Sequence, residues 1–266
     1  MSKNNKCNAH TSFTSRLPFV IAGILVAAAV AIVATLVYLD TQAHPSATPN
    51  APETYEDGFI EVDWDYWKSV NPDIIGWVNV EGTQINYPIV AAHADDPNYY
   101  LKHDIYGKYN PYGVPYLDAD CEGNIDAQNA VIYGHHMNND SMFSDFANFR
   151  DLAYVEEHSP IYLQTPEKKM KLDVKYVDVI NANKGGKYTK FDDLTSFVTW
   201  YQDQLDKATL VVDKYTQPTH VINFCTCSYS TFKNERTLVC AADPASPHIL
   251  AANLDQIKEV INDQAA

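Results

Sequence analysis

The sequence predicts a mostly β domain, folded as a barrel or a curled sheet, behind a separate N-terminal segment. Two observations lead to this fold class. Short apolar and β-branched runs follow one another along most of the chain, and only a few short helical patterns interrupt them. Hydrophobic residues make up 46% and aromatic residues 12% of the chain, which is enough for a buried core and excludes a disordered protein. An alternating strand–helix fold would show longer helical patterns between its strands.

The charge divides the chain near residue 40. The 266 residues contain 34 acidic and 19 basic side chains and have a net charge of −15, which argues against a nucleic-acid binder. Lys3, Lys6 and Arg16 are the only charged residues before position 40. Residues 40–266 therefore contain 16 basic and 34 acidic side chains, a formal charge of −18.

Residues 18–39 form an uncharged apolar run of 22 residues, and we expect them to be a transmembrane signal anchor. At about 1.5 Å per helical residue this run crosses a hydrocarbon core of roughly 30 Å. The preceding basic tail, residues 1–17, is then cytoplasmic, and the acidic bulk is extracellular. A cleaved signal peptide is the alternative, but its apolar region is usually shorter, about 7–15 residues. We therefore expect a single-pass protein of the cell membrane.

Residues 40–55 are small, polar and proline-rich, and we expect an extracellular spacer there. The folded domain is expected over residues 56–266. Asp63 is placed to cap a short helix over 64–71, which Pro72 ends. Further helical patterns occupy 96–102, 141–152, 194–208 and 251–262. Strands are predicted at 74–80, 83–90, 113–119, 129–134, 160–165, 170–180, 220–227 and 236–242.

Three strand ends contain residues suited to one kind of chemistry. Cys225-Thr226-Cys227 ends one apolar strand, His135 and His136 follow another, and Arg236 opens the next strand after the cysteines. A thiol needs a nearby imidazole to act as a nucleophile or to protonate a leaving amine. An arginine can stabilise the oxyanion that such an attack creates. Each residue alone is more often structural, but the combination indicates a cysteine nucleophile site.

Four longer segments carry a resemblance to a known family. They read NPDIIGWVNVEGTQINYPIV, DPNYYLKHDIYGKYNPYGVPYLDA, VIYGHHMNNDSMFSDF, and FCTCSY followed by ERTLVCA. In order and spacing they resemble the motifs of class B sortases, membrane-anchored cysteine transpeptidases of Gram-positive bacteria. The resemblance implies a closed β-barrel of about eight strands with an N-terminal helix, preceded by one transmembrane helix.

The resemblance also implies residue roles. The nucleophile falls on Cys227, the catalytic histidine on His135 and the arginine on Arg236, while His136 is the weaker choice of histidine. Residues that resemble substrate-contacting positions of the family are Asn86, Tyr133, Cys225 and Thr226. No metal or organic cofactor is implied.

The sequence departs from the family at one motif. Where the family has Thr-Leu-x-Thr-Cys, this chain has Asn223-Phe224-Cys225-Thr226-Cys227. Residues two apart in a strand face the same side, so a second thiol is expected beside the nucleophile. A disulfide between them would be strained in an extended strand, and packing against substrate or core is the expected role of Cys225.

The function implied by the resemblance is transpeptidation. The enzyme would cleave an Asn-Pro-x-Thr-type C-terminal sorting signal of a secreted protein after its threonine, through a cysteine thioacyl intermediate. It would transfer the protein to a cell-wall amine, in peptidoglycan or its lipid-linked precursor. One alternative is a membrane-anchored, non-catalytic peptide-binding module with a sortase-like barrel. Another is an L,D-transpeptidase, which would need histidine and glycine directly before the nucleophile, where this chain has Thr226.

Two weaker patterns remain. Residues 118–129 resemble the start of an EF-hand loop, but the glutamate expected at its twelfth position is Asn129. We therefore expect a solvated connection and no metal. The sequence leaves open whether Cys121 and Cys240 pair.

Overall fold

A computed structural model describes residues 28–32, 57–183, 188–228 and 234–249. The chain divides into two units, one up to Ala43 and one from His44 onward. In the first unit residues 28–32 are helical, and the rest of the predicted span 18–39 lies outside the described residues. No helix within the described ranges is both long enough and apolar enough to cross a membrane. The spacer at 40–55 and the helix expected at 251–262 also lie outside these ranges.

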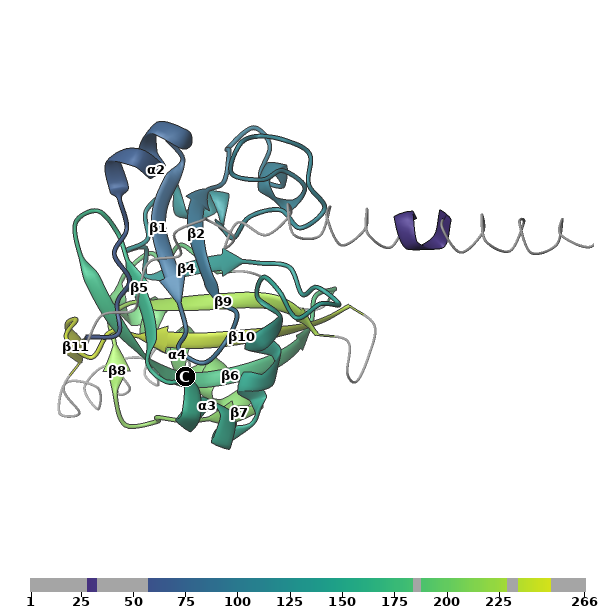
Figure 1. Ribbon diagram of the computed structural model, residues 1–266. Helices are drawn as coiled ribbons and strands as arrows, with labels where there is room; N and C mark the ends of the chain where they lie inside the picture. Colours follow the sequence, from purple (N-terminus) through teal and green to yellow (C-terminus); the bar gives the residue numbers. More distant parts are fainter. Residues whose placement is uncertain (1–27, 33–56, 184–187, 229–233, 250–266) are drawn as a thin grey trace, which may run out of the picture. The chain divides into compact units, whose positions relative to one another are not determined.

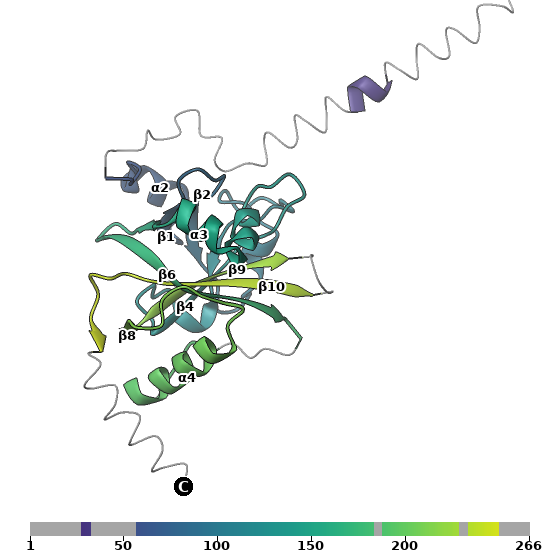
Figure 2. The same cartoon turned by 90° about the horizontal axis from the view of Figure 1, so that it is seen from below.

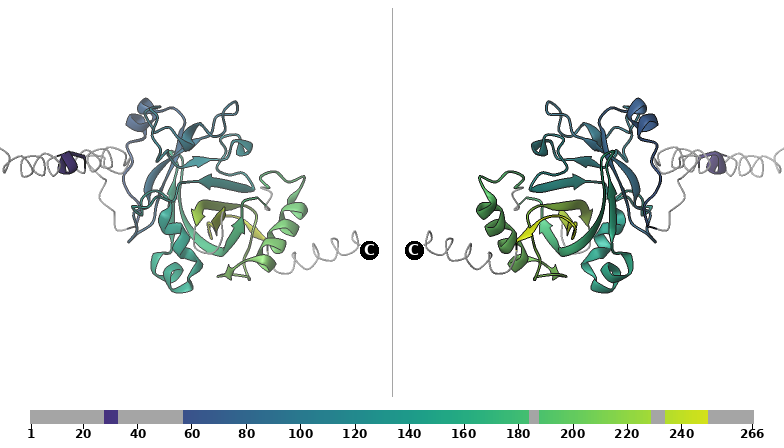
Figure 3. Two further views of the ribbon diagram at one scale, coloured as in Figure 1. Left: turned by 90° about the vertical axis from the view of Figure 1, so that its right-hand side faces the viewer. Right: turned by 90° about the vertical axis from the view of Figure 1, so that its left-hand side faces the viewer.

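The second unit contains the predicted closed β-barrel, in which eight strands of the described chain follow one another around the wall (Figures 1 and 3). Their order is β10-β9-β4-β3-β2-β1-β5-β6, and pairing of β6 with β10 closes the ring. The strands are β1 (Ile74–Asn79), β2 (Asn86–Ala91), β3 (Tyr116–Leu117), β4 (Asn129–Tyr133), β5 (Ile161–Gln164), β6 (Lys169–Asn181), β9 (Val221–Ser228) and β10 (Glu235–Ala242). Closure removes the exposed edges that an open sheet would present.

Among the described residues, three further strands are short and lie outside the ring. β7 (Leu210–Val211) pairs with β6, and β8 (Gln217–Pro218) pairs with β11 (His248–Ile249). Within the ring, β4 runs parallel to β9, while β9 and β10 are antiparallel. The ends of β4 and β9 and the start of β10 therefore meet at one rim of the barrel.

Two predicted helices are found and their caps explain their starts. Helix α2 (Trp64–Val70) begins at Asp63, whose side chain accepts a hydrogen bond from the Tyr66 backbone N–H. Helix α4 (Leu194–Lys207) begins with a capping box between Asp193 and Ser196. Figure 2 shows α4 lying across the outside of the barrel. Its apolar side packs there with side chains of β6, β9 and β10, and its buried residues are Phe197, Val198, Tyr201 and Leu205.

Two helical predictions need adjustment. The segment at 96–102 forms only a 3₁₀ turn, η2 (Tyr99–Leu101). The pattern at 141–152 forms the 3₁₀ helix η4 (Ser144–Arg150), and a separate helix α3 (Leu152–His158) follows it. Asp151 accepts a hydrogen bond from the Ala153 backbone and so begins a new helix after η4. Apolar spacing of three or four residues does not distinguish these helix types.

Aromatic residues in η4 and directly before it pack in the core of the barrel. Phe143, Phe146 and Phe149 are fully buried. The Phe146 ring stacks on Phe224 of β9, with centroids 4.8 Å apart. Phe224, the departure from the family leucine, is therefore a core residue on the opposite face of β9 from the cysteines.

The EF-hand-like segment folds as a strand connection. Asp118 caps the 3₁₀ turn η3 (Ala119–Cys121) by accepting a hydrogen bond from the Asp120 N–H. Asn129 lies in β4. In the part of the chain that the structure describes, no group of three or more His, Cys, Asp or Glu side chains could hold a metal ion. Cys121 and Cys240 are both buried, and they do not form a disulfide with each other in the described part of the chain.

Candidate active site

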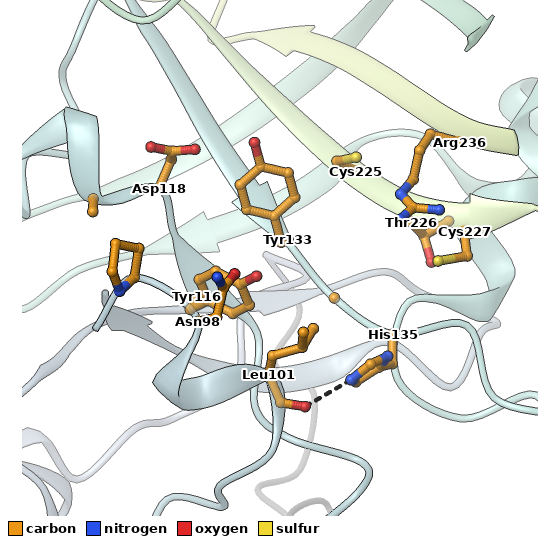
Figure 4. Close-up of a pocket in the computed structure, with 13 residues that line it drawn as sticks. Asn98, Leu101, Tyr116, Asp118, Tyr133, His135, Cys225, Thr226, Cys227 and Arg236 are labelled. Atoms are coloured by element: carbon orange, nitrogen blue, oxygen red, sulfur yellow. Dashed lines mark hydrogen bonds between the residues drawn. The ribbon is translucent and has the colours of Figure 1, made fainter. Parts of the chain in front are cut away.

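The register of β9 and β10 brings the predicted nucleophile and arginine together. Cys227 is the direct cross-strand neighbour of Arg236, and Cys225 is that of Leu238. Cys225, Cys227 and Arg236 all line one pocket, and Figure 4 shows the guanidinium beside Cys227. The Arg236 Nη1 donates a hydrogen bond to the Glu235 carbonyl at 3.2 Å, which limits the movement of the side chain.

Strand β4 brings His135 to the same rim. Tyr133 pairs with Cys225 in parallel register, and the Gly134 N–H donates to the Cys225 carbonyl at 3.1 Å. A Cβ at Gly134 would lie 2.4 Å from ring carbons of Phe143, so only glycine lets β4 continue so close to the core. The Phe143 N–H then donates to the His135 carbonyl at 2.8 Å and holds the backbone of the histidine.

The His135 ring has one defined hydrogen bond. Its Nε2 lies 2.8 Å from the Leu101 carbonyl oxygen. Since a carbonyl oxygen only accepts, Nε2 carries a hydrogen and donates it. Figure 4 shows that this nitrogen is directed away from Cys227. Nδ1 is therefore the nitrogen left for chemistry.

The neighbouring histidine belongs to another surface. His136 lines a separate pocket of about 600 Å³, together with Asp140 and Asp145. Adjacent residues of an extended chain point to opposite sides, which explains the separation. His135, and not His136, is thus the histidine that shares a pocket with Cys227.

The shared pocket has a volume of about 450 Å³. It includes the three predicted catalytic residues and also Tyr133, Cys225 and Thr226, which were predicted as substrate contacts. Asn86 is not among its lining residues. Instead the Asn86 side-chain oxygen accepts a hydrogen bond from the Trp77 indole at 2.7 Å, which holds β2 against β1.

Several pocket residues were not singled out from the sequence. They are Pro97, Asn98, Leu101, Tyr116, Asp118 and Ala119. Tyr116 comes from β3, and its ring centroid lies 5.4 Å from that of Tyr133. An aromatic residue in a strand is usually part of the hydrophobic core. The sequence therefore gives no signal that Tyr116 lines a pocket. Asn98 directly precedes the η2 turn, and only the folded chain brings this turn to the pocket.

The two thiols of β9 differ in environment. Cys225 is 6% exposed, and burial raises the pKa of its thiol to about 12, although the Arg236 charge opposes the shift. Cys227 is half-buried. Burial also raises the pKa of Tyr116 to about 12. The pKa of Tyr133 is raised mainly by burial. The negative charge of Asp118 and the hydrogen bond between Tyr133 and Asp118 raise it further. Both phenols therefore remain neutral at physiological pH.

The other departure from the family motif lies outside the pocket. Asn223 is 1% exposed, and its Nδ2 donates to the Asn129 Oδ1 at 2.7 Å. The pair joins β9 to β4, where the two strands run in parallel. Of Asn223, Phe224 and Cys225, only Cys225 lines the pocket.

The arrangement suits nucleophilic acyl substitution. A half-buried thiol, an imidazole and a guanidinium line one open pocket on three strand ends. A thiolate can attack a carbonyl carbon, the guanidinium can stabilise the oxyanion, and the imidazole can transfer a proton.

Comparison with known proteins points in the same direction. The family model described as a sortase domain matches residues 78–244. Sortase B of Listeria monocytogenes is 23% identical over 181 residues, 68% of this chain and 73% of that protein. Sortase B of Staphylococcus aureus is 27% identical over 107 residues, which span 40% of this chain and only 43% of that protein.

Solved structures agree with the barrel described above. The crystal structure of Clostridium perfringens sortase B has a TM-score of 0.61 and 28% sequence identity, and the match covers 66% of this chain and 97% of that one. A sortase B-like protein of Bacillus anthracis has a TM-score of 0.61 and 26% identity, covering 71% of this chain and 86% of that one.

Proposed function

This chain belongs to the sortase family and is similar to its class B members, and we propose that it is a cysteine transpeptidase that attaches secreted proteins to the cell wall. The observation that supports this most directly is the shared pocket of Cys227, His135 and Arg236. The proposed substrate is a C-terminal sorting signal of the Asn-Pro-x-Thr type. The proposed acceptor is an amine of peptidoglycan or of its lipid-linked precursor.

In the first half-reaction the Cys227 thiolate attacks the carbonyl carbon of the threonine. A C–S bond forms, and the carbonyl oxygen gains a negative charge that the Arg236 guanidinium stabilises. The C–N bond then breaks, and protonated His135 gives a proton to the leaving amine. Because Nε2 donates to the Leu101 carbonyl, the transferred proton comes from Nδ1.

The second half-reaction reverses these roles. The acceptor amine attacks the thioester carbon and loses a proton to His135 as the new amide forms. The C–S bond breaks, and Cys227 returns as a thiolate. The proton that His135 gives to the first amine is regained from the second, and the thioester retains enough of the energy of the cleaved amide for the new amide to form.

The N-terminal segment supports an extracellular location for this reaction. We include in the proposal that residues 18–39 anchor the chain in the cell membrane and that residues 40–55 are a spacer. The catalytic domain is then extracellular, where secreted substrates and the cell wall meet. The basic tail and the uncharged run carry this part of the proposal.

The test uses the full chain in mild detergent with a fluorogenic Asn-Pro-x-Thr peptide and an added amine. We expect cleavage and transfer by the wild type, none with Cys227→Ala and little with His135→Ala. Cys225→Ala removes the other thiol of the same pocket and so tests which of the two cysteines is the nucleophile.

Each outcome has a defined meaning. Cleavage that survives Cys227→Ala contradicts the assigned nucleophile. Loss with Cys225→Ala alone moves the nucleophile by two residues. If no Asn-Pro-x-Thr or Leu-Pro-x-Thr-Gly peptide is cleaved but peptides still bind, the non-catalytic binding module is the better description.

A further inference from the structure

The acceptor of the His135 hydrogen bond lies on a turn far from β4 in sequence. Leu101 ends the η2 turn, and its carbonyl oxygen receives the Nε2 hydrogen at 2.8 Å. A backbone carbonyl cannot be adjusted by a side-chain rotamer. Its direction depends on the backbone of the turn and on what packs against it.

The chain returns to this turn twelve residues later. The Gly113 N–H donates to the Asn110 carbonyl at 3.0 Å, and the Val114 N–H donates to the Tyr100 carbonyl at 3.0 Å. These bonds bring the backbone of Gly113 directly against the carbonyl groups of Tyr100 and Leu101.

Gly113 has no room for a side chain. A Cβ built there would lie 2.4 Å from the Tyr100 carbonyl oxygen and 2.9 Å from that of Leu101. The backbone φ of Gly113 is +59°, a conformation that favours glycine. The neighbouring atoms are backbone, so relief of the contact requires movement of the turn itself.

We propose that Gly113 is a positioning residue for His135, acting through the Leu101 carbonyl. The absence of a Cβ at Gly113 lets the carbonyl lie where it accepts the Nε2 hydrogen. This contact holds the ring so that Nδ1 is the nitrogen available to the reacting groups. Gly113 itself does not line the pocket. Its replacement therefore alters the histidine without altering the surface that a peptide touches.

Gly107 provides a matched control in the same segment. Its φ is +71°, so alanine there has a comparable backbone strain. Its Cβ would meet only the Tyr99 hydroxyl, at an ordinary contact distance of 3.4 Å. Gly113→Ala and Gly107→Ala thus introduce similar backbone strain. Only Gly113→Ala places a Cβ against the carbonyl groups of Tyr100 and Leu101.

The test combines nitrogen NMR and kinetics on the full chain in detergent. With ¹⁵N-labelled histidine, His135→Ala identifies the His135 resonances. We expect a donating Nε2–H in the wild type and in Gly107→Ala, and a changed Nε2 resonance in Gly113→Ala. The NMR result does not depend on any activity, so it separates this proposal from the transpeptidase proposal on which the kinetic part rests.

In the peptide assay we expect Gly113→Ala to lower kcat about 10- to 100-fold, with KM little changed, because a small displacement of a catalytic group is costly. Gly107→Ala should stay close to the wild type. Gly113→Asn tests the same contact with less backbone strain, because asparagine tolerates positive φ. An unchanged His135 resonance in a folded Gly113→Ala or Gly113→Asn protein overturns the proposal, as does an equal loss of kcat in Gly107→Ala.

Discussion

At the scale of single residues, the two cysteines of β9 differ in burial, and burial affects how easily a thiol ionises. They lie two positions apart and line the same pocket. Burial of Cys225 raises the pKa of its thiol to about 12, whereas Cys227 is half-buried at the rim. Since the thiolate is the reactive form, we expect Cys225 to react slowly near neutral pH.

This difference predicts selective alkylation. At pH 8 iodoacetamide should modify Cys227 in the Cys225→Ser variant. It should modify Cys225 in the Cys227→Ser variant more than about 100-fold more slowly, because so little thiolate is present. Mass spectrometry of the peptide that contains β9 measures both rates. Comparable rates would contradict the assignment of Cys225 as a buried, inert thiol.

Arg236 is the second residue with a specific requirement. It lies directly across from Cys227, and its guanidinium also donates to the Glu235 carbonyl. Lysine keeps the charge but has no planar set of donors. We expect Arg236→Lys to lower kcat about 100-fold or more, as loss of an oxyanion donor does, with a normal unfolding curve. Steady-state kinetics measure this effect. A kcat close to the wild-type value would show that Arg236 does not stabilise the oxyanion.

At the scale of elements, an ion pair joins β6 to the segment that directly follows β7. Lys175 of β6 has a side chain only 3% exposed, and its ammonium lies 3.1 Å from Asp213. Burial by itself raises the pKa of Asp213, but hydrogen bonds from Thr216 and Tyr215 and the Lys175 charge outweigh it and hold the pKa at about 2. The folded protein therefore binds the Asp213 proton less readily than the unfolded chain does.

The sign of this shift predicts acid sensitivity. A lowered carboxyl pKa stabilises the fold above the unfolded value of 3.8, and the stabilisation is lost as the pH falls from about 4 to about 2. Asp213→Asn should lose about 1–3 kcal/mol at neutral pH, since Lys175 is left buried without its partner. The variant should then show a weaker pH dependence than the wild type below pH 4.

Denaturant unfolding at pH 7, 4, 3 and 2 measures this effect. Asp203→Asn, in an exposed ion pair on α4, is the control and should follow the wild type at neutral pH. Parallel curves for Asp213→Asn and the wild type between pH 4 and 2 would count against the Asp213 assignment.

At the scale of the whole molecule, the division of charge near residue 40 predicts how the chain partitions in a cell. An uncharged run of 22 residues after a basic tail favours stable insertion with the tail inside. The full chain should remain in the membrane fraction after carbonate extraction, and a chain that begins at Asp40 should not. Release of the full chain by carbonate would contradict the anchor.

Much of the fold follows from local patterns in the sequence. The alternation of apolar residues in 170–180 predicts β6, and the caps at Asp63 and Asp193 begin helices α2 and α4. Helix α3 is not predicted, because Val155 is its one buried residue and a single apolar position shows no helical period. The two-residue strands β7, β8 and β11 are too short to form a pattern of their own.

The sequence by itself determined the candidates for the chemistry, because Cys227, His135 and Arg236 each lie at a strand end within a recognisable motif. It also distinguished the barrel from an alternating fold. Only the tertiary structure decided which residues meet. Pairing of β4 with β9 brings His135 and Cys227 to one rim, and Asn86 lies elsewhere, bonded to Trp77. The contact between Gly113 and the Leu101 carbonyl likewise joins segments that sequence patterns treat as separate. Local patterns follow from the period of one strand or helix, whereas these contacts depend on how distant strands pair around a closed barrel.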